Sequence, residues 1–79
     1  MPTHQQFRAA RALLEWSRAE VARRAGLSEV TIKRLEVEAI GASAETQRRV
    51  QDVFEAAGVQ WIGTTGVKLA RRRTKGADE

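Results

Sequence analysis

The stretch SRAEVARRAGLSEVTIKRLE, residues 17–36, decides the fold. Ser17 is followed three positions later by Glu20, which is the spacing of a capping box at the start of a helix. Gly26 is suited to end that helix, because a residue without a Cβ adopts the left-handed conformation easily. Ser28 can then cap the next helix. The stretch therefore predicts two helices joined by a turn so short that their axes must cross steeply.

The flanking sequence predicts two more helices. One should begin near His4, where Thr3 and Gln6 have the spacing of another capping box. Its predicted buried stripe is Phe7, Ala10, Leu13 and Leu14. Ser43 can cap a fourth helix that ends at Gly58. The inward positions of that helix are predicted at Val50, Val53, Phe54 and Ala57.

Residues 59–70 have a different pattern, in which the short runs VQWI and VKLA are separated by GTTG. This pattern predicts a hairpin with a four-residue loop, with Val59 and Trp61 on one face and Gln60 and Ile62 on the other. A lone hairpin is marginal in water, so it must pack on the helices or pair with another chain. We expect it to help build a homodimer. The expected interface residues are Val59, Trp61, Ile62, Val67 and Leu69.

Length and composition limit the possible functions. The 79 residues predict one domain over residues 1–70 and a mobile basic tail over 71–79. There is no cysteine and one histidine, His4, so we expect no metal site, cofactor or catalytic residue, and no enzyme. No apolar run is long enough to cross a membrane and no signal-peptide pattern is present, which predicts a cytoplasmic protein. The net charge of +4 favours a polyanionic partner, although basic surfaces without a partner are also common.

Residues 17–37 resemble the helix-turn-helix of the Xre, or lambda-repressor-like, family of bacterial and phage transcription regulators. The matching positions are Val21 and Ala22 in the first helix, Gly26 at the turn, and Ile32 and Leu35 in the second helix. The resemblance covers residues 6 to 58 and implies a mainly helical domain of four to five helices, here with a C-terminal hairpin. It also implies a sequence-specific regulator, most simply a repressor, that binds double-stranded DNA. If the hairpin builds a homodimer, we expect the two copies to read a palindromic operator.

The family pattern places base-reading residues at the start of the second helix and one turn further on. The residues at those positions are Ser28, Glu29, Val30, Lys33 and Arg34. A helical rotation of about 100° per residue turns the same side chains outward if Ile32 and Leu35 face inward. The expected phosphate contacts are Ser17, Arg18, Arg23, Arg24 and Thr31.

Each base reader has an alternative explanation. Arg34 can bind guanine O6 and N7, or remain in solvent. Lys33 lies four residues after Glu29, so the two can form a surface ion pair instead of reading bases. Glu29 can also accept from cytosine N4, and Val30 can contact a thymine methyl or be incidentally exposed. The basic tail can follow the phosphate backbone or only aid solubility.

The sequence departs from the family at two positions. Arg18 stands where the family commonly has glutamine, so the orienting role of that glutamine cannot be carried over. Glu38 stands where the family often has a helix-ending glycine, which allows a longer third helix. Two other functions use a similar fold. One is an antitoxin that masks a toxin, and the other is an anti-activator that holds a protein partner through the hairpin. No small-molecule ligand or membrane partner is indicated.

Overall fold

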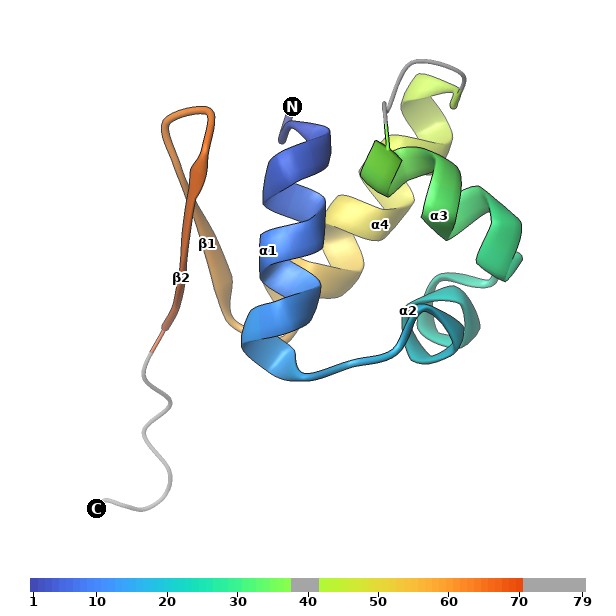
Figure 1. The fold of residues 1–79 in the computed structure, drawn as a ribbon, viewed down its shortest axis with the longest axis horizontal. Coiled ribbons are helices and arrows are strands. Elements are labelled where there is room, and N and C mark those ends of the chain that lie inside the picture. Colours follow the sequence, from blue (N-terminus) through green and yellow to red (C-terminus); the bar gives the residue numbers. More distant parts are fainter. Residues whose placement is uncertain (38–41, 71–79) are drawn as a thin grey trace.

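The computed structural model describes residues 1–37 and 42–70, which form helices followed by a small antiparallel hairpin (Figure 1). The elements are α1 (His4–Leu14), α2 (Arg18–Ala25), α3 (Glu29–Val37), α4 (Ala44–Ala56), β1 (Val59–Ile62) and β2 (Gly66–Leu69). The predicted mainly helical fold with a C-terminal hairpin is confirmed. The predictions for Glu38 and for the tail 71–79 lie outside the described residues.

Local capping fixes where the helices begin. At α1 the box is complete, because Thr3 Oγ1 accepts from the Gln6 amide at 3.2 Å and Gln6 Oε1 accepts from the Thr3 amide at 3.0 Å. At α2, Ser17 Oγ accepts from the Glu20 amide at 3.0 Å. The Glu20 carboxylate, however, binds Arg23 and Arg24 instead of returning to the cap. The second box is therefore half formed.

The turn between α2 and α3 follows the prediction. Gly26 ends α2 with φ of 71°, and the Leu27 amide donates to the Ala22 carbonyl at 2.9 Å. Ser28 Oγ then accepts from the Thr31 amide at 3.2 Å and caps α3. In Figure 1, α2 is seen almost end-on while α3 runs across the view, so the two axes cross steeply.

The core lies where all four helices and β1 meet. Its buried apolar residues are Phe7, Ala10, Val21, Ala22, Ala25, Ile32, Leu35, Val50, Phe54 and Val59. The prediction for Leu13 was wrong, because this side chain is 41% exposed. Rotation along α1 places Leu13 about 120° from Phe7, at the flank of the stripe, whereas Leu14 packs against the core.

The hairpin packs on its own helices. Val59 pairs with Leu69 and Ile62 pairs with Gly66, so the loop has three residues, 63–65, and not the predicted four. The Trp61 ring contacts the Phe7 and Phe54 rings edge-on, with centroids 6.0 and 6.1 Å apart. Figure 1 shows α1 between the hairpin on one side and α2 and α3 on the other.

A buried glutamine ties the hairpin loop to α1. Gln6 Nε2 donates to the carbonyls of Gly66 at 2.8 Å and Gly63 at 3.1 Å, while Thr3 Oγ1 donates to the Thr64 carbonyl at 2.7 Å. Because Gln6 also completes the cap of α1, one side chain fixes both the start of that helix and the position of the hairpin.

Candidate functional site

The outward face of α3 is formed by Val30, Lys33, Arg34 and Val37. Their spacing of three and four residues places them on one side of the helix, and together they line a hollow of about 270 Å³. Val30 is 63% exposed and Val37 is 54% exposed, while Ile32 and Leu35 on the opposite side are buried. In Figure 1, α3 lies at the edge of the molecule farthest from the hairpin. The helix is thus held by its inner face and presents its outer face to solvent.

The start of α3 carries the other predicted base readers. Ser28 and Glu29 are exposed, and Ser28 Oγ lies 3.0 Å from Thr31 Oγ1. Thr31 is half-buried, and its hydroxyl is directed at the Ser28 cap and not at solvent. Glu29 and Lys33 form no ion pair, although they are four residues apart. The surface ion pair considered as the alternative role for these two side chains is therefore absent from this structure.

Arg34 differs from every other arginine that the structure describes. Within residues 1–37 and 42–70, it alone among arginines forms no hydrogen bond or ion pair with another described residue. The arginines that have such partners are Arg8, Arg11, Arg18, Arg23, Arg24, Arg48 and Arg49. Lys33, beside Arg34, also forms no such contact. Among the residues that the structure describes, the lysines and arginines without such a contact are therefore Lys33 and Arg34, side by side on the outward face of α3, and Lys68 in β2.

A buried carboxylate connects α1, α2 and α3. Glu36 is 1% exposed, and its carboxylate accepts from Arg11 Nε at 2.5 Å, Arg11 Nη2 at 3.1 Å and Arg18 Nε at 3.1 Å. The hydrogen bond with Glu36 raises the pKa of the Arg11 guanidinium. The Glu36 carbonyl also accepts from Arg8 Nη1 at 2.6 Å. This cluster of Glu36, Arg11 and Arg18 fixes the C-terminal turn of α3 against the other two helices.

The sequence predicted that Arg18 contacts phosphate; in this structure its guanidinium is directed at Glu36, and the phosphate contact stays a prediction. The burial of Glu36 was not predicted from the sequence. The spacing indicates this burial, because Glu36 lies four residues after Ile32 and therefore shares the inward face of α3. A buried acid at such a position requires a cationic partner, which Arg11 and Arg18 supply.

The basic residues at the end of α2 are also paired. Glu20 accepts from Arg23 Nη2 and from Arg24 Nε, each at 2.6 Å, and these hydrogen bonds, Arg23 first, lower the pKa of the Glu20 carboxyl. The Arg24 guanidinium lies 4.1 Å from the centroid of the Trp16 ring. Because the Arg23 side chain is 69% exposed, its remaining N–H groups stay open to solvent. The Ser17 hydroxyl is used as the cap acceptor of α2.

The predicted dimer residues divide into two groups. Val59 is buried, and Trp61 and Val67 are half-buried against the core, so these three side chains pack within the chain, while their part in a dimer interface stays a prediction. They face inward because residues opposite each other in the hairpin share a face, and that face covers α1 and α4. Ile62 lies on the opposite face and is 51% exposed, whereas Leu69 pairs with Val59 and shares the inward face but remains 43% exposed at the end of β2.

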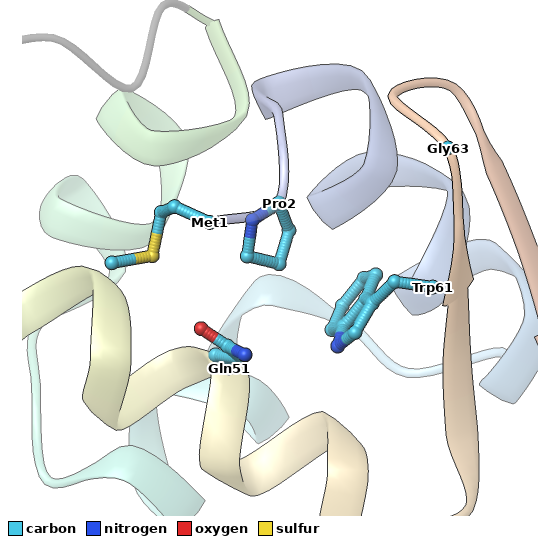
Figure 2. A pocket seen from close by; sticks show the side chains of 5 residues that line it. All are labelled: Met1, Pro2, Gln51, Trp61 and Gly63. Carbon is cyan, nitrogen blue, oxygen red and sulfur yellow. The ribbon is translucent and has the colours of Figure 1, made fainter.

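A second hollow lies between the N-terminus, α4 and β1. It measures about 140 Å³ and is lined by Met1, Pro2, Gln51, Trp61 and Gly63, with the Trp61 ring facing Gln51 and Pro2 (Figure 2). This volume is below the several hundred Å³ that enclose a typical small-molecule ligand. Among residues 1–37 and 42–70 there is no cluster of three or more histidine, cysteine or acidic side chains that could hold a metal ion.

Comparisons with protein-family models, with curated proteins and with solved structures found no significant match for this chain. None of the helices in the described ranges is long and apolar enough to span a membrane. Function must therefore be inferred from the outward face of α3 and from the distribution of charge around it.

Proposed function

We propose that the chain is a small Xre-like transcriptional regulator that binds double-stranded DNA sequence-specifically through α3. The observation that carries the proposal is the charge distribution. The described arginines outside α3 all bind acidic side chains or a backbone carbonyl, whereas Arg34 and its neighbour Lys33 on the outward face do not. Two uncompensated cations on an exposed helix match the phosphates and guanine edges of a major groove, which is wide enough to admit a helix.

The position of α2 supports the same proposal. In a helix-turn-helix, the first helix crosses the DNA backbone and directs its N-terminal N–H groups at a phosphate. Ser17 caps this end of α2, and Arg23 keeps free N–H groups in solvent. We assign the phosphate contacts of α2 to its backbone and to Arg23, because Arg18 is held by Glu36.

We further propose that two copies act together, most simply as a repressor at a palindromic operator. A dimer would present two copies of α3 about 34 Å apart, which is one turn of DNA. The exposed side chains Ile62 and Leu69 and the open strand edges of the hairpin remain for such an interface. Light scattering at micromolar concentration should give twice the mass of the chain, and protection of a single half-site by a monomer would refute this.

The DNA-binding proposal is tested by selecting bound sequences from random duplexes and repeating the selection with Arg34→Ala. We expect the variant to lose its base preference at one position in each half-site. Its free energy of binding to the selected sequence should weaken by about 1–3 kcal/mol. Arg48→Ala is a matched control, because it removes another exposed arginine, which forms an ion pair with Asp52 within α4. It should leave the selected sequence unchanged. Binding no tighter than that of a generic basic protein would contradict the proposal and favour the protein-interaction alternative.

A further inference from the structure

Two valines interrupt the charged outward face of α3. Val30 and Val37 are among the most exposed large apolar side chains in the described residues, and both line the hollow that also contains Lys33 and Arg34. Val30 precedes Arg34 by four residues, so the two side chains are neighbours on the helix surface, with Cβ atoms roughly 6 Å apart. The hollow therefore places an apolar group directly beside an unpaired guanidinium.

The chemistry of this pair restricts what it can recognise. The cations argue for a polyanionic occupant and against an apolar surface of a protein partner, because burying unpaired charges against apolar groups is costly. Among the base edges in the major groove, guanine presents two acceptors suited to arginine. The apolar group displayed there is the C5-methyl of thymine. The same methyl is carried by 5-methylcytosine.

We propose that Val30 recognises the 5-methyl group of a pyrimidine next to the guanine that Arg34 binds. This inference rests on the proposed function and deepens it, because it names the chemical group that is read. Thymine and 5-methylcytosine satisfy Val30 equally, since the methyl group is what they share. Unmethylated cytosine and uracil do not.

The size of the effect follows from the burial of one methyl group. Removing it from water stabilises the complex by an amount equivalent to about a fourfold change in affinity. Replacing thymine by deoxyuridine removes only this methyl and keeps base pairing and charge. Affinity for the duplex should thus fall about fourfold for each half-site in which the contacted thymine is replaced.

The experiment uses the full chain and a duplex selected from a random library. Each thymine in the duplex is replaced in turn by deoxyuridine, and affinity is measured for the wild-type protein, Val30→Ala and Leu13→Ala. Leu13 is the matched control, because it is another exposed apolar side chain but lies in α1 and belongs neither to α3 nor to the expected dimer interface. We expect one thymine per half-site to show the methyl dependence with wild type and Leu13→Ala, and the dependence to disappear with Val30→Ala. A duplex with 5-methylcytosine at that position, paired with guanine, should bind more tightly than the same duplex with unmethylated cytosine, by the same factor.

Three outcomes would overturn the inference. Sequence-specific binding without any dependence on a thymine methyl would refute it while leaving the proposed function intact. A methyl dependence that persists in Val30→Ala and is lost in Val37→Ala would assign the reading to the other valine. Absence of sequence-specific binding by the wild-type protein would refute the proposed function and the inference together. Circular dichroism of each variant shows that the comparison is made between folded proteins.

Discussion

Replacing Glu36 with glutamine should destabilise the fold strongly. The Glu36 carboxylate is 1% exposed and accepts three hydrogen bonds, two from Arg11 and one from Arg18. Glutamine keeps the volume and one acceptor oxygen but loses the negative charge, and its NH₂ group would face guanidinium donors. Two cations would then remain close together without the charge that holds them.

The expected magnitude follows from burial. Breaking a buried ion pair by removing one partner costs about 3–5 kcal/mol. The Arg11 and Arg18 side chains are 25% and 40% exposed, so water recovers part of their solvation, and we expect a loss of about 2–3 kcal/mol. A domain of this size has a free energy of unfolding of only about 4–10 kcal/mol. Its Tm should fall by roughly 10–20 °C.

Thermal unfolding followed by circular dichroism measures this change. The matched control is Glu20→Gln, which removes another carboxylate that binds two arginines, but on the surface of α2. The free energy of unfolding of Glu20→Gln should fall much less, and this decrease should become smaller in high salt. The decrease for Glu36→Gln should persist in high salt, because buried charges are weakly screened. A Tm for Glu36→Gln within about 3 °C of wild type would refute the reasoning.

Three further changes test other parts of the structure. Gln51 and Trp61 Nε1 donate to Glu55 and lower its pKa, so the Trp61 indole N–H resonance should titrate below pH 4.5. The corresponding stability is present above the pKa of unfolded Glu55, is lost as the pH falls through the folded pKa, and is removed by Glu55→Gln. Gln6→Ala leaves carbonyls of the hairpin loop without a donor. It should lower the free energy of unfolding measured in urea by about 1–3 kcal/mol and should speed amide hydrogen exchange in the hairpin. Gly26→Ala should lower the free energy of unfolding by about 1–2 kcal/mol, because alanine is strained in the left-handed backbone conformation. Steric contact adds nothing, since the new Cβ would lie no closer than 3.7 Å to the nearest atom of another part of the chain.

The helix boundaries could be predicted because their causes are local. The caps at Thr3, Ser17, Ser28 and Ser43 each bond to an amide three residues later, and Gly26 ends α2 through its own backbone conformation. Such contacts depend on sequence spacing alone. The inward apolar positions followed from the same periodicity, with the exception of Leu13 at the flank of α1, whereas the burial of the polar residues Gln6 and Glu36 was not predicted.

The partners of charged side chains could not be predicted, because they depend on how the helices cross. Arg11 and Arg18 lie 25 and 18 residues before Glu36 in the sequence, and only the packing of α1 and α2 against α3 brings them together. The hairpin shows the same limitation. Its alternation predicted that Val59 and Trp61 share a face, but it did not decide whether that face covers this chain's own helices or a second copy.

This internal pairing changes how the charge of residues 17–36 should be interpreted. Counted along the sequence, three of the four arginines of the segment lie in its first helix, and only Arg34 lies in the second. In the structure, Glu20 binds Arg23 and Arg24 and Glu36 binds Arg18, so the arginine of the segment that has no acidic partner is Arg34 on the outward face of α3. Under the proposed function, Glu36 thus has two effects, since it positions α3 and binds Arg18, which would otherwise be free to contact phosphate. A loss of sequence preference in a Glu36 variant would therefore reflect the orientation of α3 together with a newly released cation on α2.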